Sequence, residues 1–321
     1  MKKKPDIFYS KILLFGEYSI LCDSMGLTIP YTHFKAELSF IKDDKYTDLD
    51  FARNSNGLLF EYIPYLRKLK EDNKLLCAFD VQAFSKDVEK GLYLESNIPQ
   101  GYGVGSSGAL VAALYKRYVK SPISDDQELS SQQINELRLQ FSQLESFFHG
   151  TSSGIDPLNC FIGQPLLIRS REDISIVGIP GDTENKQGGI FLVNTGTPGK
   201  TEPLVNLFME MCRESGFKQK LQDQMIPFTN QCITDLINGN TTSFFGNLAR
   251  LSAFTLEHLK PMIPGIFGHA WMQGLSTGDY YMKLCGSGGG GFLLGFTKNF
   301  ARAKRILKEK NIDVIPVYLN S

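Results

Sequence analysis

The sequence predicts an α+β protein with two domains. Its 321 residues leave room for two domains or one large one, and an apolar fraction of 42% supplies enough side chains for a core. Strand-like and helix-like segments alternate in both halves of the chain, and glycine-rich turns separate several of them. These features exclude a disordered or fibrous protein.

Periodicity and turn residues define the elements of the first half. They are a strand over residues 7–15, mainly helical structure over 51–90, a strand over 91–98, a glycine loop over 101–108, a helix over 109–120, a helix beginning near residue 130, a polar turn over 151–157 and a strand over 165–169. Lys11 is a charged residue within an otherwise largely apolar strand. It therefore needs a specific explanation.

The helix beginning near residue 130 has the clearest pattern. Ser130 or Ser131 is available as its N-cap. Glu145 lies at the edge of its apolar stripe, and His149 with Gly150 ends it. The stripe recurs at intervals of three and four residues and consists of Ile134, Leu137, Phe141, Leu144 and Phe148.

The second half also alternates between strands and helices. A change in composition over residues 180–189 predicts the domain boundary, with one domain over residues 1–186 and the other over 187–321. The elements expected after it are a strand over 190–194, helices around 203–215, 228–238 and 242–259, a glycine run over 286–291, a strand over 292–296, a helix over 299–310 and a strand over 313–318.

Charge and cysteine usage exclude several classes of protein. Lys plus Arg and Asp plus Glu are both 34, so the net charge is +0 and disfavours a dedicated nucleic-acid binder. No apolar run approaches the roughly 20 residues of a membrane-spanning helix. The six cysteines lie far apart without a CxxC pair, which disfavours a zinc cluster. With no export features, we expect a cytoplasmic protein with reduced thiols.

The glycine loop over residues 101–108 predicts an anion site. Glycine lets backbone N–H groups approach a phosphate closely, and the N-terminus of the following helix adds partial positive charge. Residues 103–108 fit the dinucleotide pattern GxGxxG, but no acidic residue about 20 positions on ends a second strand. GxxxxGK[ST] is absent, which excludes a P-loop. A tight turn used only for packing is the structural alternative.

Longer motifs resemble those of the GHMP kinases, the superfamily of galactokinase, homoserine kinase, mevalonate kinase and phosphomevalonate kinase. The string from Pro99 to Ala109 resembles their nucleotide-binding motif. Residues 11–18 (KILLFGEY) resemble the first motif, and residues 283–291 (KLCGSGGGG) resemble the third. Residues 194–201 (NTGTPGKT) resemble the stretch that begins the second domain. The motifs occur in the order found in the family.

The resemblance implies a two-domain GHMP kinase fold. The N-terminal, ATP-binding domain would resemble ribosomal protein S5 domain 2, and the C-terminal domain would be ferredoxin-like. Residues 149–156 (HGTSSGID) are most similar to the HGxPSGxD segment of the mevalonate kinases. Three positions depart from the family: Ser152 stands where proline is usual, Tyr18 replaces histidine and Val104 replaces leucine.

The implied reaction transfers the γ-phosphoryl group of ATP to the hydroxyl of mevalonate, early in isoprenoid synthesis. Ser107 and Glu145 would hold Mg²⁺, a cation that prefers oxygen ligands. Asp156 would accept the hydroxyl proton, and Lys11 beside it would keep this carboxylate ionised and lower the pKa of the alcohol. The residues expected to bind ATP are Pro99, Gly101, Gly103, Val104, Gly105, Ser106, Ser107 and Gly108.

The substrate side would include Glu17, Tyr18, His149, Thr201 and Gly288. Simpler structural roles stay open for the main candidates at this point. Lys11 could extend from an edge strand into solvent, Glu145 could be a solvated helix residue and Asp156 could be a turn residue before Pro157. Ser107 could only cap a helix that begins at Gly108, and His149 could only end its helix.

Other functions also stay open. The acceptor could be phosphomevalonate, homoserine or a sugar, or the chain could be a catalytically silent sensor that binds ATP and a metabolite on the same fold. A dehydrogenase that uses NAD through GxGxxG lacks the expected ribose-binding acid. We expect a small-molecule alcohol as partner, with no nucleic acid and no membrane, and a homodimer is possible.

Overall fold

The computed structural model describes residues 6–42, 44, 47–124, 128–180 and 187–319. The chain forms two compact units, each built from three segments. Unit 1 consists of residues 1–11, 30–98 and 105–164, and unit 2 of residues 12–29, 99–104 and 165–321. Strands β1 (Phe8–Phe15) and β2 (Gly26–Phe40) therefore contribute to both units. The boundary predicted after residue 186 falls on residues outside the described part and stays a prediction.

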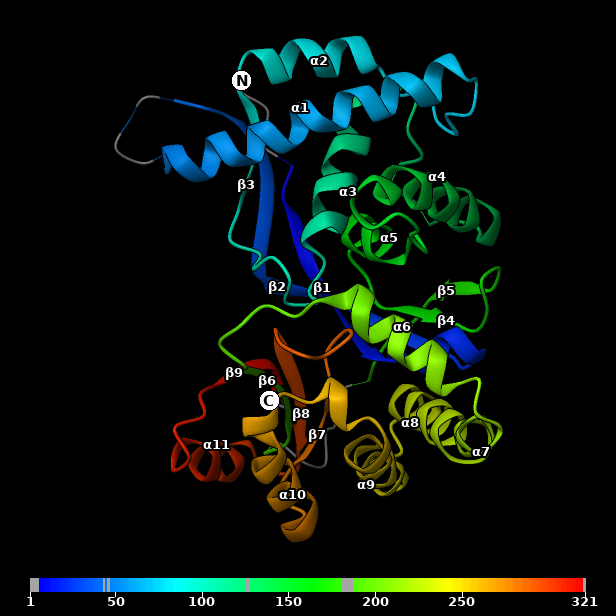
Figure 1. Cartoon of the computed structure of the whole chain (residues 1–321), viewed down its shortest axis with the longest axis vertical. Coiled ribbons are helices and arrows are strands. Elements are labelled where there is room, and N and C mark those ends of the chain that lie inside the picture. The colour runs from blue at the N-terminus through cyan, green and yellow to red at the C-terminus, as the bar shows by residue number, and fades with distance from the viewer. Residues whose placement is uncertain (1–5, 43, 45–46, 125–127, 181–186, 320–321) are drawn as a thin grey trace. The chain divides into compact units, whose positions relative to one another are not determined.

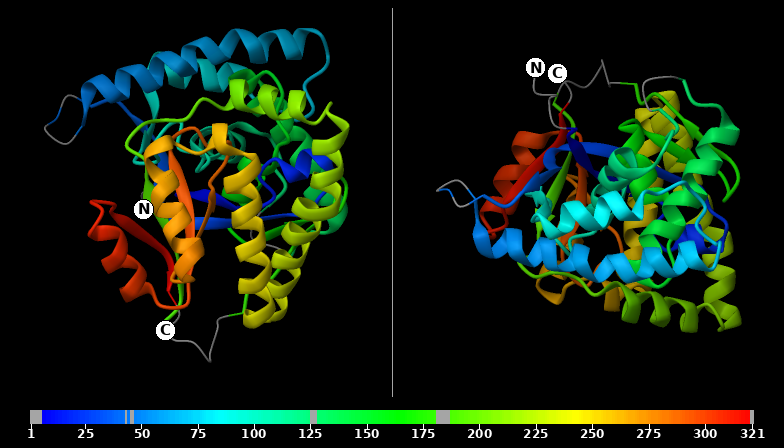
Figure 2. Two further views of the ribbon diagram at one scale, coloured as in Figure 1. Left: turned by 60° about the horizontal axis from the view of Figure 1, so that its bottom comes forward. Right: turned by 90° about the horizontal axis from the view of Figure 1, so that it is seen from above.

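Unit 1 combines one edge of a sheet with helices. The second half of β2 pairs with β3 (Leu92–Ser96) in antiparallel register, with Leu38 opposite Leu94. Figures 1 and 2 show α1 (Leu49–Glu71) and α2 (Val81–Glu89) side by side. The strand over 7–15 and the helical character of 51–90 are confirmed. Besides the β1 and β2 segments, the unit contains α1 (Leu49–Glu71), α2 (Val81–Glu89), β3 (Leu92–Ser96), α3 (Ser106–Tyr118), α4 (Ser131–His149) and α5 (Ile155–Ile162).

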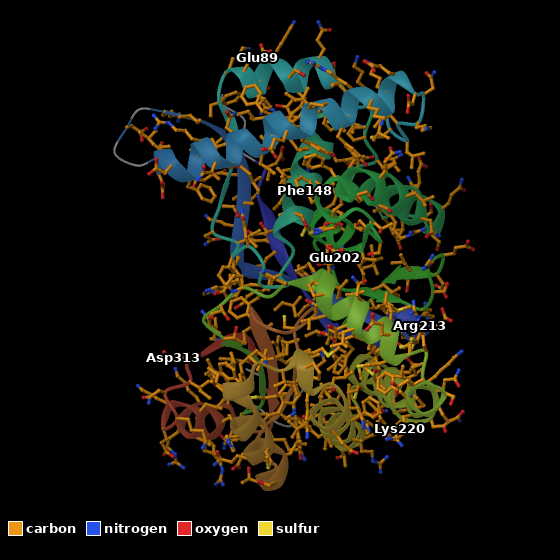
Figure 3. All side chains as sticks on the ribbon, in the orientation of Figure 1. Glu89, Phe148, Glu202, Arg213, Lys220 and Asp313 are labelled. Carbon is orange, nitrogen blue, oxygen red and sulfur yellow. The ribbon has the colours of Figure 1, made fainter. Side chains whose placement is uncertain are left out.

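Helix α4 forms as its pattern predicts. The Ser130 hydroxyl accepts from the backbone N–H of Gln133, and the Gln133 side chain returns a contact to the Ser130 backbone, which makes a capping box. The stripe residues Ile134, Leu137, Phe141 and Leu144 are buried. Figure 3 shows the Phe148 side chain on this helix; its ring centroid lies 5.5 Å from that of Tyr62 on α1.

Two helix starts differ from the prediction. Helix α3 begins at Ser106 rather than Ala109, because Gly105 adopts the left-handed conformation that precedes the first turn. The polar turn predicted over 151–157 ends early, because Gly154 is the N-cap of α5 and Asp156 lies in its first turn. Pro157 is tolerated there, since the first N–H groups of a helix have no partner within it.

Unit 2 contains a four-stranded antiparallel sheet among its described residues. The strand order is β7 (Tyr281–Leu284), β8 (Phe292–Thr297), β6 (Gly189–Asn194) and β9 (Val314–Leu319). This order is that of a ferredoxin-like sheet, and the glycine run lies between β7 and β8. The unit also holds β4 (Leu166–Ile168), β5 (Ile174–Ile176), β6 (Gly189–Asn194), α6 (Thr201–Met211), α7 (Ser215–Lys220), α8 (Ile226–Asn238), α9 (Thr241–His258), α10 (Gly268–Thr277), β7 (Tyr281–Leu284), β8 (Phe292–Thr297), α11 (Phe300–Lys308) and β9 (Val314–Leu319).

The first half of β2 pairs with β4 within unit 2, with Leu27 opposite Leu167. Short helical segments complete the unit at Ser19–Cys22, Leu221–Met225, Lys260–Met262 and Gly265–Phe267. Across the described residues, every helix is too short or too polar to cross a membrane.

Candidate active site

A buried lysine and a partly exposed aspartate form an ion pair in unit 1. The Lys11 Nζ lies 2.8 Å from Asp156 Oδ1. The Lys11 side chain is 6% exposed and that of Asp156 is 39% exposed. Lys11 therefore does not extend into solvent, which rules out that structural alternative. The Asp156 carboxylate remains accessible to a small molecule from solution.

Glu145 lies near this pair and is also buried. It is 4% exposed, so its alternative role as a solvated helix residue is wrong. Its carboxylate accepts two hydroxyl hydrogen bonds: Ser107 Oγ donates to Oε1 at 2.9 Å, and Ser152 Oγ donates to Oε2 at 2.5 Å. Both carboxylate oxygens are thus held by serines from different elements.

The electrostatics of Glu145 are unusual for a carboxyl group. Burial, followed by the nearby charge of Asp156, raises its pKa from the ordinary value of 4.5 to about 7. The two serine hydroxyls and Lys11 act in the opposite direction. The positive charge of Lys11 therefore does not balance both Glu145 and Asp156. A cation bound here would favour the ionised form of Glu145.

Two glycines of the loop let its backbone approach these acidic and basic groups. A Cβ on Gly105 would lie 2.8 Å from Lys11 Cγ. A Cβ on Gly108 would lie 2.8 Å from the backbone carbonyl carbon of Asp156. The first turn of α3 consequently packs directly against Lys11 and Asp156, with its backbone N–H groups at a helix N-terminus, the kind of place that binds phosphate.

The Ser107 hydroxyl makes contacts that capping a helix would not require. It lies inside the first turn of α3, so it does not cap a helix that begins at Gly108. Its Oγ lies 2.9 Å from His149 Nε2 as well as from Glu145 Oε1. His149 ends α4, is exposed, and adds a ring nitrogen to this group. Sequence reasoning gave no sign of the contact between His149 and Ser107.

The donor set fits a hard divalent cation. Ser107 Oγ and Glu145 Oε1 are both oxygen ligands of the kind that Mg²⁺ takes while it keeps waters or phosphate oxygens. No cluster of three or more His, Cys, Asp or Glu side chains in the described part of the chain could hold a metal ion.

A second group of predicted residues lies in unit 2, around a buried ion pair. Lys283 Nζ lies 2.6 Å from Glu17 Oε2, with both side chains almost fully buried. The same ammonium donates to the Leu284 carbonyl at 2.9 Å and lies 5.4 Å from the centroid of the Phe15 ring. The pair joins the first motif to the third.

Tyr18 makes a second link between these motifs. Its hydroxyl donates to the Ser287 carbonyl at 2.5 Å, and its ring centroid lies 4.7 Å from that of Phe208. Burial and the charge of Glu17 raise the pKa of Tyr18. Ser287 Oγ in turn donates to Thr201 Oγ1 at 3.2 Å, at the exposed start of α6.

Three predicted glycines of unit 2, Gly101, Gly103 and Gly288, lie against the backbone of other segments. The Gly199 N–H donates to the Gly101 carbonyl at 2.9 Å. A Cβ on Gly103 would lie 2.9 Å from the Cys285 carbonyl oxygen, and one on Gly288 would lie 2.3 Å from that of Met262. Val104 is buried and Pro99 is partly exposed. The predicted residues thus form two groups, one in each unit.

Sequence reasoning missed one residue in each of these groups, Lys283 in unit 2 and Ser152 in unit 1. Lys283 lies between Met282 and Leu284 in a buried strand. A charge within an apolar strand is the signal that drew attention to Lys11, and it could have identified Lys283 too. Ser152 stood out only as a departure from the family pattern, and no sequence signal predicted its contact with Glu145.

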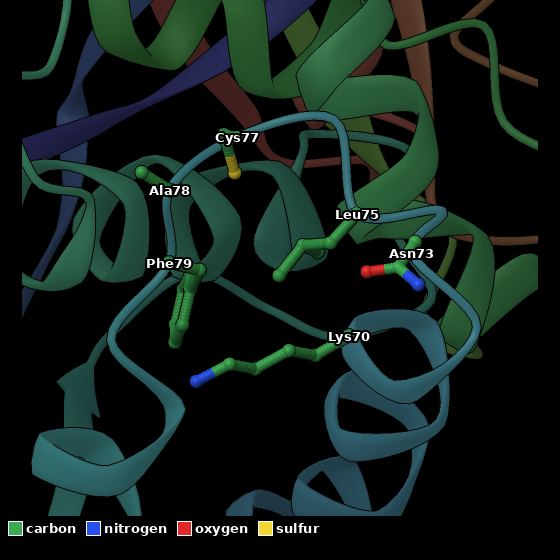
Figure 4. Close-up of a pocket in the computed structure, with 6 residues that line it drawn as sticks. All are labelled: Lys70, Asn73, Leu75, Cys77, Ala78 and Phe79. Atoms are coloured by element: carbon green, nitrogen blue, oxygen red, sulfur yellow. The ribbon is translucent and has the colours of Figure 1, made fainter.

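A cavity of about 280 Å³ also lies in unit 1 near the end of α1 (Figure 4). None of its lining residues is a predicted site residue, and burial raises the pKa of its Cys77 thiol to about 12, which keeps the thiol protonated. The cavity is lined by Lys70, Asn73, Leu75, Cys77, Ala78 and Phe79.

Comparison of the sequence with known proteins points to one family. Residues 67–164 match the family model described as the GHMP kinases N terminal domain. A mevalonate kinase of Dictyostelium discoideum is 25% identical over 235 residues, which cover 64% of this chain and 57% of that protein. The chain thus matches less than two thirds of this relative's length.

Comparison with solved structures gives the fold. The mevalonate kinase of L. major in complex with R-mevalonate superposes with a TM-score of 0.65 at 17% identity, covering 100% of this chain and 97% of that one. The Lactococcus lactis galactokinase complexed with galactose gives 0.64 at 14% identity, covering 99% and 94%. Residues 67–164 therefore match the N-terminal domain of the GHMP kinases, and the chain has a two-domain α+β fold similar to that of GHMP kinases such as mevalonate kinase and galactokinase.

Proposed function

We propose that this protein is an ATP-dependent kinase that transfers the γ-phosphoryl group to the hydroxyl of mevalonate. The observation that carries the proposal is the cluster of Lys11, Asp156, Glu145 and Ser107 within unit 1, packed against the first turn of α3. Phosphoryl transfer to an alcohol requires a phosphate site, charge neutralisation and a group that takes the hydroxyl proton. The cluster offers a candidate for each.

Asp156 is the proposed proton acceptor. Its side chain is 39% exposed, so a substrate hydroxyl can reach it. Its place in the first turn of α5 and its contact with Lys11 fix its position. A base must lie within hydrogen-bond reach of the proton that it takes, and a fixed carboxylate meets this condition with little loss of entropy.

Lys11 is proposed to act mainly through Asp156. At 6% exposure its ammonium has little access to a substrate, but it lies 2.8 Å from Asp156 Oδ1. The nearby charge of Asp156 raises the pKa of Glu145, and the positive charge of Lys11 acts in the opposite direction. Lys11 therefore allows two acids to share one site.

The phosphates of ATP are proposed to bind at the start of α3. Its first N–H groups have no partner within the helix, and the helix dipole favours an anion there. Ser107 and Glu145 would hold Mg²⁺, which neutralises charge on the β- and γ-phosphates when bound. The remaining loop residues, Pro99, Gly101, Gly103, Val104, Gly105, Ser106 and Gly108, would line the nucleotide.

Mevalonate is proposed as the acceptor because the relative with 25% identity is a mevalonate kinase and because residues 149–156 resemble the matching segment of that family. Action in isoprenoid synthesis and a cytoplasmic location belong to the same proposal. Glu17, Tyr18, His149, Thr201 and Gly288 are proposed to shape the acceptor side, with Glu17 and Tyr18 acting through the third motif that they hold.

A sugar kinase is the second candidate, because the galactokinase superposes almost as well as the mevalonate kinase. Release of ADP from MgATP, followed with the purified protein and a panel of mevalonate, phosphomevalonate, homoserine and galactose, separates the two. We expect turnover with mevalonate. Turnover with galactose or homoserine but not with mevalonate would refute the proposed substrate, and binding of ATP without turnover of any alcohol would indicate a sensor.

A further inference from the structure

Ser152 contacts Glu145 where the family pattern has proline, a residue that could not make this contact. Its hydroxyl donates to Glu145 Oε2 at 2.5 Å and accepts from the backbone N–H of Gly154 at 3.0 Å. Proline has neither a hydroxyl nor a backbone N–H, so it could not supply the donor. The bond is a property of this chain's own sequence.

The backbone of Ser152 is fixed to the same helix that carries Glu145. Ser142 on α4 donates from its hydroxyl to the Ser152 carbonyl at 2.5 Å. Gly154 then packs so tightly on α4 that a Cβ there would lie 2.1 Å from the Arg138 carbonyl oxygen. The loop that follows α4 therefore contacts this helix at two points on either side of the Ser152 hydroxyl's bond to Glu145.

The two serines that contact Glu145 divide its oxygens between them. Ser107, a proposed metal ligand, contacts Oε1, and Ser152 contacts Oε2. With Oε2 occupied, the carboxylate cannot rotate freely, and Oε1 stays beside Ser107 Oγ. Hydrogen bonds that orient a ligating carboxylate in this way contribute to metal affinity even though their donors never touch the metal.

We propose that Ser152 positions the Glu145 carboxylate for a divalent cation, so that this chain's metal affinity depends on the Ser152 hydroxyl. The inference rests on the proposed function, which assigns the metal to Ser107 and Glu145. It goes further by giving a role to a residue that the family pattern does not contain. Ser152 is a positioning residue, since it acts through Glu145.

The test compares nucleotide binding with and without metal. Calorimetry gives the dissociation constant of a non-hydrolysable ATP analogue, AMPPNP, in MgCl₂ and in EDTA. The ratio of the two constants measures what the metal adds. We expect Ser152→Ala to lower this ratio by about tenfold, with the value in EDTA unchanged, and Ser152→Thr to restore it because threonine keeps a hydroxyl. If Ser152 had only a structural role, Ser152→Ala would change the dissociation constant of AMPPNP equally in MgCl₂ and in EDTA.

Ser146→Ala is the matched control. Ser146 follows Glu145 on α4, and its hydroxyl donates to the Ser142 carbonyl at 2.7 Å rather than to the carboxylate. We expect its ratio to equal that of the wild type. A wild-type ratio in Ser152→Ala, or a failure of Ser152→Thr to restore it, would overturn the inference alone. A wild-type protein that gains nothing from Mg²⁺ would overturn the metal site itself, and the inference with it.

Discussion

The Lys283 ammonium and the Glu17 carboxylate lie 2.6 Å apart and are both buried, although the two residues are far apart in the sequence. Removing one partner leaves an uncompensated charge in the interior, whereas removing both does not. We therefore expect Glu17→Gln and Lys283→Met each to lower the free energy of unfolding by about 3 kcal/mol, and the double variant to lose less than the sum.

Urea denaturation of the wild type, the two single variants and the double variant gives the free energies of unfolding for this comparison. The exposed pair of Arg169 and Asp173, 3.3 Å apart, serves as the control, since such pairs contribute at most about 1 kcal/mol. Additive losses for Glu17 and Lys283 would mean that the pair contributes nothing as a pair.

Asp156→Asn should slow phosphoryl transfer without preventing nucleotide binding. Asparagine keeps the shape of the side chain but cannot take the proton, so we expect kcat to fall by on the order of 10² or more. The dissociation constant of ATP, measured by calorimetry, should change little.

Asp72→Asn is the matched control for Asp156→Asn. Asp72 also pairs with a lysine, Lys74, at 3.4 Å, and is 42% exposed, but it lies outside the site. Its variant should keep the wild-type kcat. A normal kcat in Asp156→Asn would remove Asp156 from the reaction.

The raised pKa of Glu145 predicts a pH dependence of stability in the metal-free protein. A carboxyl group whose pKa is about 7 when folded and near 4.5 when unfolded stabilises the fold fully only below the unfolded value. That stability is lost as the pH rises through 7. Relative to Glu145→Gln, the wild type should therefore lose on the order of 2 kcal/mol between pH 5 and pH 8.

Thermal or urea unfolding in EDTA at both pH values measures this difference. Glu136→Gln, an exposed position on the same helix, provides the comparison and should show no such change. Parallel pH profiles for the wild type and Glu145→Gln would show that the Glu145 carboxyl titrates as an ordinary one.

Gly154 and Gly163, which cap the two ends of α5, should respond differently to substitution by alanine. Both are left-handed, with φ of 76° at Gly154 and 67° at Gly163. A Cβ at Gly154 would lie 2.1 Å from the Arg138 carbonyl oxygen, whereas one at Gly163 meets nothing within 4 Å. Gly163→Ala should cost about 1 kcal/mol of backbone strain, and Gly154→Ala about 3 kcal/mol or more.

Gly154→Ala should also reduce kcat, because the first turn of α5 carries Asp156 and small displacements of a reacting group are costly. Urea denaturation and steady-state kinetics on both variants provide the measurements. Equal losses of stability at the two glycines would contradict the close packing of Gly154 on α4.

The sequence predicted best those elements whose stabilising residues lie close together in the chain. Helix α4 has Ser130 as its N-cap and carries an apolar stripe, and the sequence predicted the stripe and offered Ser130 as one of two possible caps. Strand β2 was missed: its 15 residues include Pro30 and several polar side chains, and its partners are β3 and β4, far along the chain. Such a strand depends on distant partners that no short window of sequence contains.

The site follows the same rule. The chemistry of Lys11, Ser107, Glu145 and Asp156 could be proposed from residue types and family motifs. Their contacts depend on how loops turn, as with Ser152, or on which strands become neighbours, as with Lys283. Asp156 shows the limit most clearly, because the Asp-Pro pair reads as a turn while the left-handed Gly154 before it starts a helix.

The interleaved segments of the two units mean that no single cut divides the chain into self-sufficient halves. A fragment ending near residue 186 would keep Phe15, whose ring lies 5.9 Å from Phe244 and 5.5 Å from Phe296, and would lose both partners. The complementary fragment would lack residues 12–29 and 99–104 of its own unit. Each half would expose apolar surface that the intact chain covers, so separate expression invites aggregation rather than two folded products.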